Sequence, residues 1–262
     1  MKIALAQMDI LWEDKENNKI KCENFIAQAK EKGADIIAFP EMTLTGFSQN
    51  VSKIGETNNE TIDWFKNQSI KYGIYTCFGY VEKYDLKGKN KLAVISPEGK
   101  EISSYTKIHP FSYGNEDKFY YKGTDINLFN IGDAVVSTAI CYDLRFPEIF
   151  QAASKSAELI IVIANWPKSR IDAWITLLKA RAIENQCYIA GVNRVGNGDG
   201  IEYCGDSMIV DPKGNVLASS RDNEEIIIAE IDTKTVEQIR ESFPYKMDRQ
   251  EDLYIRLFQQ NY

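Results

Sequence analysis

Three side chains that could act together on a carbonyl compound stand directly after strand-like runs of the sequence. Glu41 follows "IIAFP", Lys107 follows "ISSYT" and Cys141 follows "VVSTAI". A cysteine becomes an effective nucleophile when a base takes its proton, because the unperturbed thiol is mostly neutral at neutral pH. A carboxylate can be that base, and a lysine can stabilise the anion that develops during attack. Considered singly, Cys141 is more typical of a core thiol, and the other two are more typical of surface charges.

The remaining reactive side chains are few. His109 is the only histidine in the 262 residues, which excludes any mechanism or metal site that needs two imidazoles. A papain-like pair of Cys141 and His109 remains the weaker alternative. The five cysteines show no paired spacing, so we expect neither a disulfide frame nor a zinc ribbon, and no metal or organic cofactor.

The charge and hydropathy of the chain limit the kinds of molecule that it is expected to bind. The formal net charge is -7 and there is no basic block, which argues against nucleic acid or an anionic membrane as a partner. No run approaches the roughly 18 to 20 apolar residues that span a bilayer, and the N-terminal stretch lacks the features of a secretory signal. We therefore expect a cytoplasmic protein that acts on a small molecule.

Strand-like runs alternate with segments of helical period, which is typical of an α/β fold. Helices are expected over about 14–32, 58–72, 147–156 and 171–186. "ADIIAFPE" in the first half matches "AELIIVIANW" in the second, and "VISPEGKEISSY" matches "IVDPKGNVLASS". These repeats predict two similar halves within a single domain, residues 1–262, because no linker separates them. The tail, residues 243–262, either packs on a partner subunit or lies in solvent.

Three motifs, "FPEMTLTGF", "YTKIHPF" and "ICYDLRFPE", resemble in their order those of the nitrilase superfamily, the carbon-nitrogen hydrolases. The resemblance spans nearly the whole chain. It implies a four-layer α-β-β-α sandwich of two pseudo-symmetric halves. It also implies that Glu41 is the general base, that Lys107 stabilises the tetrahedral intermediate, and that Cys141 is the nucleophile. Family members usually form dimers, so a homodimer or higher homo-oligomer is expected by analogy.

Further roles follow from the same resemblance. Glu116 in "SYGNEDKF" fits the position of a second glutamate, with Asp117 as an alternative, and His109 fits a supporting position. The backbone N–H of Tyr142 and the ammonium of Lys107 are the expected donors to the oxyanion. Such a site would hydrolyse an amide through a thioester, with water as the second substrate.

The segment "NWPKSRIDAWITLLKARAIENQCYIAGVNRVGNG" is similar to bacterial ω-amidases, which hydrolyse 2-oxoglutaramate or 2-oxosuccinamate. An acidic substrate needs a cation at the far end of its pocket, and Arg170 is the candidate, although a solvated arginine at a helix start is an equal alternative. Trp166 and Phe47 are candidate pocket walls or core residues. Arg145 is expected to pair with Asp143. Other linear amides (deaminated glutathione, N-carbamoyl compounds), nitriles, or a non-catalytic binding role remain alternatives.

Overall fold

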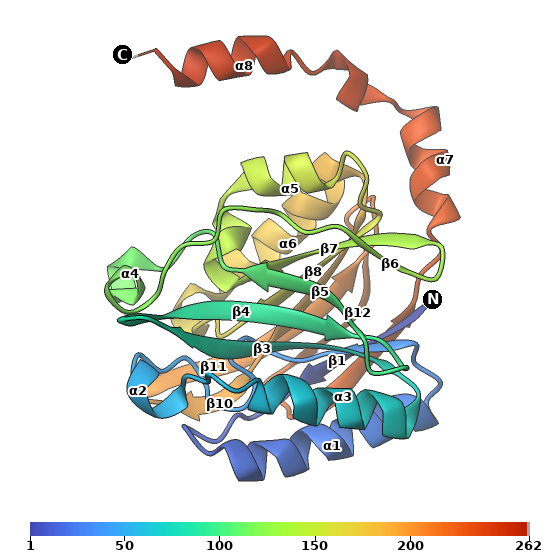
Figure 1. Cartoon of the computed structure of the whole chain (residues 1–262). Helices are drawn as coiled ribbons and strands as arrows, with labels where there is room; N and C mark the ends of the chain where they lie inside the picture. The colour runs from blue at the N-terminus through green and yellow to red at the C-terminus, as the bar shows by residue number, and fades with distance from the viewer. Residues whose placement is uncertain (261–262) are drawn as a thin grey trace.

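The chain folds into two β-sheets that stack face to face, with helices on the outer face of each, as Figure 1 shows. The computed structural model describes residues 1–260. The first sheet has six strands, in the order β13 (Glu225–Glu230), β1 (Lys2–Gln7), β2 (Ile36–Ala38), β3 (Tyr75–Tyr84), β4 (Lys87–Ile95) and β5 (Glu101–Thr106). The second sheet has seven, in the order β10 (Val195–Gly198), β11 (Ile201–Val210), β9 (Tyr188–Asn193), β8 (Leu159–Ala164), β7 (Ala134–Ile140) and β6 (Phe129–Ile131), with β12 (Val216–Arg221) on β11.

Two pairs of helices form the outer layers. Helices α1 (Lys15–Glu31) and α3 (Glu60–Tyr72) bury apolar side chains such as Phe25 and Phe65 against the first sheet. Helices α5 (Pro147–Ala153) and α6 (Ile171–Asn185) do the same on the second sheet, with Phe150 and Trp174. The shorter helices are α2 (Val51–Ile54) and α4 (Glu116–Phe119). The predicted four-layer α-β-β-α sandwich is confirmed.

The two halves repeat one strand arrangement. In the first sheet β1, β2 and β3 are parallel, and β4 and β5 continue antiparallel. In the second sheet β7, β8 and β9 are parallel, and β11 and β12 continue antiparallel. The predicted matches fall on equivalent elements, β2 with β8 and the β4–β5 hairpin with the β11–β12 hairpin. The predicted pseudo-symmetry is therefore confirmed.

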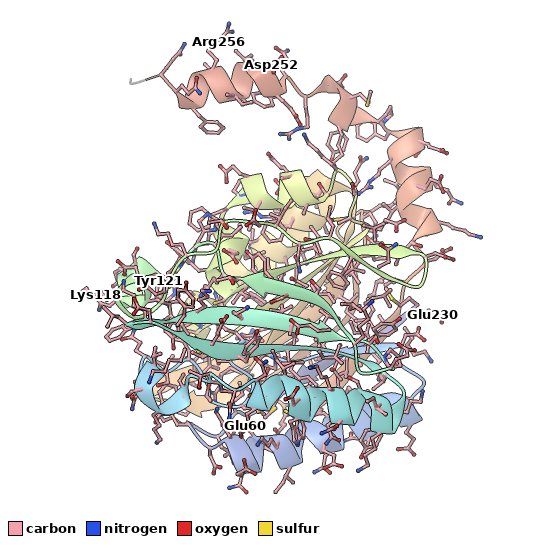
Figure 2. All side chains as sticks on the ribbon, in the orientation of Figure 1. Glu60, Lys118, Tyr121, Glu230, Asp252 and Arg256 are labelled. Atoms are coloured by element: carbon pink, nitrogen blue, oxygen red, sulfur yellow. The ribbon has the colours of Figure 1, made fainter. Side chains whose placement is uncertain are left out.

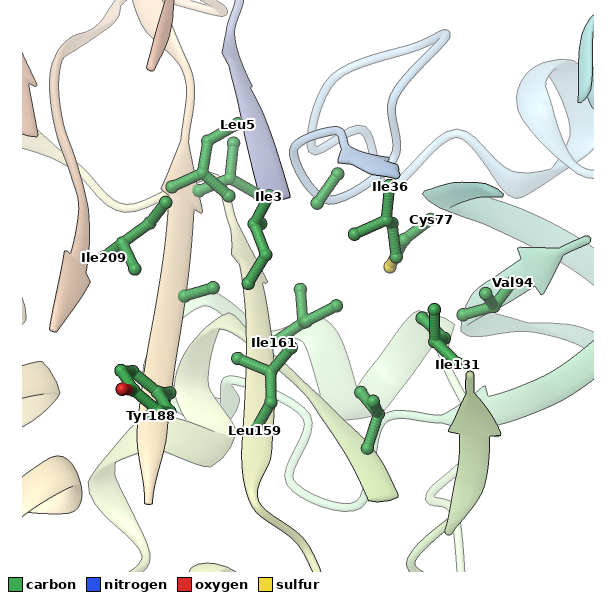
Figure 3. Packing of buried hydrophobic residues seen from close by; sticks show 14 of the residues in the cluster. Ile3, Leu5, Ile36, Cys77, Val94, Ile131, Leu159, Ile161, Tyr188 and Ile209 are labelled. Atoms are coloured by element: carbon green, nitrogen blue, oxygen red, sulfur yellow. The ribbon is translucent and has the colours of Figure 1, made fainter. Parts of the chain in front are cut away.

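The main core lies between the sheets. Ile3, Ile36 and Val94 of the first sheet point toward Ile161 and Ile209 of the second, as Figure 3 shows. Each is fully buried. Because one cluster takes side chains from both sheets, burial of this apolar surface holds the two halves in one arrangement. The ends of β2, β7 and β8 are thereby fixed relative to one another.

The C-terminal segment leaves this body. After α7 (Lys234–Ser242) the chain forms a short 3₁₀ turn (Tyr245–Asp248) and then α8 (Glu251–Phe258), a helix for which the sequence analysis made no prediction. Figure 2 places Asp252 and Arg256 on α8, clear of the sheets. Packing of this tail on a partner subunit stays a prediction. Among residues 1–260, every helix is too short or too polar to cross a bilayer.

Candidate active site

Glu41 is held just beyond β2 by a turn that requires a close approach of two backbones. The carboxylate is fully buried. Met42 has a φ of 47°, so the chain reverses immediately after Glu41. A Cβ on Gly79 of β3 would lie 2.4 Å from the Met42 nitrogen, so β3 reaches this turn only because residue 79 has no side chain. The motif "FPEMT" thus points Glu41 into the space at the strand ends.

Lys107 lies between two carboxylates. Its Nζ is 2.9 Å from Oε1 of Glu41 and 2.9 Å from Oε2 of Glu116, and all three side chains are buried. The Phe111 N–H donates to Oε2 of Glu116 at 2.5 Å. Asp117, the alternative for the second glutamate, is exposed at the surface. The structure therefore brings Glu116, and not Asp117, to Lys107.

Cys141 stands at the junction of β7 and the 3₁₀ turn Cys141–Arg145. Its φ of 48° is in the left-handed region, which costs a non-glycine residue about 1–3 kcal/mol. Its Sγ lies 3.9 Å from the Asn165 carbonyl oxygen. The other four cysteines are buried, whereas Cys141 is partly exposed. In a 3₁₀ turn an N–H bonds the carbonyl three residues earlier, so the Tyr142 N–H has no acceptor within this turn.

The charges around Cys141 set its protonation. Burial and the Glu41 charge raise the pKa of the Cys141 thiol well above its usual value, although Lys107 pulls it down. Burial opposes the charge on Lys107, but Glu116 and Glu41 raise its pKa well above the ordinary lysine value. The two pKa directions favour a neutral Cys141 thiol and a charged Lys107 ammonium before substrate binds. Burial also raises the pKa of Glu116, against the opposing effect of Lys107.

Asp143, within the turn that follows Cys141, is bonded by residues other than Arg145. Its Oδ1 accepts from the His109 N–H at 3.0 Å and lies 2.8 Å from Nδ1 of His109. Its Oδ2 accepts from the Tyr105 hydroxyl at 2.8 Å and the Ile140 N–H at 3.1 Å. The predicted Arg145–Asp143 ion pair is wrong, because these groups already occupy both carboxylate oxygens. The His109 ring stacks on Phe146, at 3.7 Å between ring centroids, and its Nδ1 bonds Asp143, whereas Sγ of Cys141 lies near the Asn165 carbonyl.

Two asparagines complete the network. The Asn165 N–H donates to Oε2 of Glu41 at 3.0 Å, and its Nδ2 donates to the Glu41 carbonyl at 2.5 Å. Nδ2 of Asn90, on β4, donates to both Glu41 and Glu116. The sequence analysis did not select Asn90. The signal was a polar residue at an inward position of an alternating strand, since Asn90 is buried between two partly exposed lysines, Lys89 and Lys91.

A pocket of about 470 Å³, its open mouth included, leads from solvent to Cys141 and Lys107. Aromatic side chains are prominent in its wall, and they are Phe47, Phe111, Tyr142, Trp166 and Tyr203. Trp166 is also buried in the core beside Trp174, at 5.5 Å between ring centroids, so both alternatives for this residue hold. Phe47 lies over Lys107, with Nζ 5.4 Å from its ring centroid.

Two arginines also line the pocket. The Arg170 guanidinium lies 5.2 Å from the Phe111 ring centroid, and that of Arg145 lies 4.9 Å from the Trp166 ring centroid. Within residues 1–260, neither arginine lies within ion-pair distance of a carboxylate. Arg170 is thus at the predicted pocket, and Arg145 joins it there. The same residues contain no cluster of three or more His, Cys, Asp or Glu side chains that could hold a metal ion.

A four-layer sandwich with a cysteine, a lysine and two glutamates gathered at its strand ends defines a class of enzyme, the carbon-nitrogen hydrolases. The family model described as "Carbon-nitrogen hydrolase" matches residues 2–241, so the chain belongs to this family. The protein is a hydrolase that acts on amides.

Similar proteins agree with this assignment. The chain is 34% identical to a 2-oxoglutaramate amidase of Bacillus subtilis over 96% of this chain and 98% of that protein. It is 32% identical to an omega-amidase, YafV, of Yersinia enterocolitica, over 93% of this chain and 94% of that protein. A solved carbon-nitrogen hydrolase superfamily protein of Xanthomonas campestris, with an arsenic adduct in its active site, is 29% identical at a TM-score of 0.89, over 95% of this chain and 97% of that one.

Proposed function

We propose that the protein is an ω-amidase that hydrolyses the terminal amide of 2-oxoglutaramate or 2-oxosuccinamate. The observation that carries the proposal is the pocket itself. The Cys141 thiol and the Lys107 ammonium line it, and Glu41 is bonded to Lys107. Arg145 and Arg170 also line it, without a carboxylate partner among residues 1–260. The names of the relatives from Bacillus and Yersinia support the same substrate class.

In the first half of the proposed reaction, Glu41 takes the proton of Cys141 as the thiolate attacks the amide carbon. The S–C bond forms as the C=O π bond breaks, and negative charge moves to the carbonyl oxygen. The Lys107 ammonium and the Tyr142 N–H stabilise this oxyanion. Glu41 then gives its proton to the amide nitrogen, the C–N bond breaks, and ammonia leaves a thioester on Cys141.

In the second half, Glu41 removes a proton from water as the hydroxyl attacks the thioester carbon. The tetrahedral intermediate uses the same two oxyanion donors. Its collapse breaks the C–S bond, and the thiolate regains the proton from Glu41. Every proton transfer involves a group already buried at the site, so the chain's own side chains suffice for each step.

The substrate carboxylate explains the two arginines. A guanidinium presents planar N–H donors that match a carboxylate, and a partly buried pair of this kind is stronger than one in water. Arg145 and Arg170 each lie over a ring face, and within residues 1–260 neither guanidinium pairs with a carboxylate, which leaves N–H groups available for a ligand. Because the protein as a whole is acidic, with a formal net charge of -7, two cations in one pocket are a local feature that favours an anionic substrate.

The test is an ammonia-release assay over a panel. It compares 2-oxoglutaramate and 2-oxosuccinamate with a neutral linear amide of the same length, an N-carbamoyl amine, a deaminated-glutathione analogue and a nitrile. We expect kcat/KM for the two acidic ω-amides to exceed that for the neutral amide about a hundredfold or more, because a hydrogen bond to a charged group contributes about 1.5–3 kcal/mol.

The control is Cys141→Ala, which should release no ammonia from any compound while its circular dichroism and Tm match the wild type. A higher kcat/KM for the carbamoyl amine, the nitrile or the neutral amide would reject the ω-amidase assignment. Turnover by Cys141→Ala would remove Cys141 from the mechanism.

A further inference from the structure

Asn90 lies between the two site carboxylates without lining the pocket. Its Nδ2 donates to Oε1 of Glu41 at 2.7 Å and to Oε1 of Glu116 at 2.9 Å. Its backbone carbonyl accepts the Lys107 N–H at 2.9 Å. The side chain is 1% exposed and is absent from the pocket wall. Asn90 therefore contacts three of the four residues of the proposed chemistry and does not itself line the pocket.

The orientation of the Asn90 amide is set by the carboxylates. Its Oδ1 is buried and has no hydrogen-bond partner within residues 1–260, which is unfavourable for a carbonyl oxygen. The opposite orientation would direct Oδ1 at Glu41 and Glu116, where oxygen would face oxygen. The two hydrogen bonds from Nδ2 to the carboxylates thus stabilise this orientation by more than the unpaired Oδ1 destabilises it.

The N–H groups of Lys107 show why the two carboxylates need a donor besides Lys107. Nζ donates to Oε1 of Glu41 and to both carboxylate oxygens of Glu116, at 2.9 to 3.1 Å, so its three hydrogens are all engaged. To stabilise an oxyanion, Lys107 must turn one N–H away from these carboxylates. The Asn90 amide is neutral and has no role at the oxyanion, so it continues to hold both Oε1 atoms during that movement.

We infer that Asn90 is a positioning residue for the proposed reaction. It fixes Glu41 relative to Glu116, and it adds a second donor to Oε1 of Glu41, so that Oε2 is the oxygen left to receive the thiol proton. Within residues 1–260, Oε2 accepts one hydrogen bond, from the Asn165 N–H, whereas Oε1 accepts two. This inference rests on the proposed function, because the base role of Glu41 belongs to that proposal.

The first test is Asn90→Asp, which keeps the shape of the side chain and replaces a donor with an acceptor. We expect kcat on 2-oxoglutaramate to fall about a hundredfold, the scale of a misplaced catalytic group, while KM changes less than about threefold. We also expect the pH profile of Cys141 alkylation by iodoacetamide to move about one pH unit upward, because an added carboxylate disfavours the thiolate.

The second variant is Asn90→Leu, which removes both donors at similar volume. Here kcat should fall similarly, and the acidic limb of the pH–kcat profile should move to higher pH, because the carboxylates lose donors that favour their charged form. The matched control is Asn185→Asp, the same change at a fully buried asparagine whose Nδ2 bonds the Arg181 carbonyl within α6. It should lower Tm without moving either pH profile.

A folded Asn90→Asp with wild-type kcat and an unmoved alkylation profile would overturn the inference, as would an effect on KM alone. If Asn90→Asp does not fold, an unchanged kcat in Asn90→Leu overturns the inference. If neither variant folds, Asn90 is a structural residue and the inference is wrong. Alkylation does not depend on the substrate. A wild-type enzyme inactive on the whole panel would therefore reject the proposed function, while the alkylation profile would still decide the role of Asn90.

Discussion

Next to the pocket, the buried carboxylates of Glu41 and Glu116 both bond the buried Lys107 ammonium, whereas Arg145 and Arg170 in the pocket wall are partly exposed and lie over ring faces. The inner charges have to be paired, since an unpaired buried charge is very unfavourable. The pocket-wall arginines keep their solvation and their free N–H donors. The difference separates two tasks, namely a fixed constellation for the reaction and available cations for the substrate.

The largest effect should come from breaking the inner network at its cation. We expect Lys107→Met to reduce kcat about a thousandfold, because removal of one oxyanion donor lowers kcat by a factor of about 10²–10³. The free energy of unfolding should fall by about 3–5 kcal/mol, because two buried carboxylates lose their partner. Ammonia-release kinetics and urea denaturation measure the two effects.

The matched control for that change is Lys91→Met. Lys91 also stands on the first sheet and pairs with Glu82 at 2.9 Å, but this pair is partly exposed, so its removal should cost about 0–1 kcal/mol. Equal losses of stability in the two variants would show that the inner network is no more demanding than a surface ion pair.

A smaller effect should follow from changes in the pocket wall. We expect Arg170→Ala and Arg145→Ala each to raise KM for 2-oxoglutaramate about 10- to 100-fold, with less than about a threefold change for a neutral amide of equal length. Lys168→Ala is the control. Lys168 is two residues before Arg170 in the sequence, but its side chain is exposed and pairs with Glu202 at 2.6 Å. Equal effects on acidic and neutral amides would discard the carboxylate contact.

The smallest effect concerns the resting thiol. Because burial and Glu41 raise the pKa of Cys141, less thiolate is present at pH 7.5 than in a free cysteine. Alkylation by iodoacetamide should therefore be about tenfold or more slower than for free cysteine, since each pKa unit is a factor of ten. The rate should continue to rise above pH 9. Cys141→Ser is the control that removes the reaction, and a rate plateau below pH 8 would contradict the raised pKa.

Much of the fold could be predicted from the sequence. The four main helices and the parallel strands follow from periodicity, and the structure has them at 15–31, 60–72, 147–153 and 171–185. Glu41, Lys107 and Cys141 each follow a strand-like run, but it was the resemblance of their three motifs to the carbon-nitrogen hydrolases that selected them. Helix α8 was missed, since it lies in a tail that mixes aromatic and charged residues.

Pairing of side chains could not be predicted in the same way. Asp143 and Arg145 are two positions apart, yet Asp143 bonds Tyr105 and His109, which precede it by 38 and 34 residues. Asn90 is a similar case, because its partners Glu41 and Glu116 lie 49 and 26 residues away. Which donor meets which acceptor depends on how the strands stack.

The sequence by itself determined the elements, the repeat of the two halves and the residue types at the strand ends, because periodicity and turn residues act over short distances along the chain. Only the tertiary structure decided that Glu116 and Asn90 meet Glu41 and Lys107, and that Arg145 lines the pocket beside Arg170. The physical reason is burial. Stacking the sheets removes water from the carboxylates, and each then bonds whichever donor the packing has brought within reach.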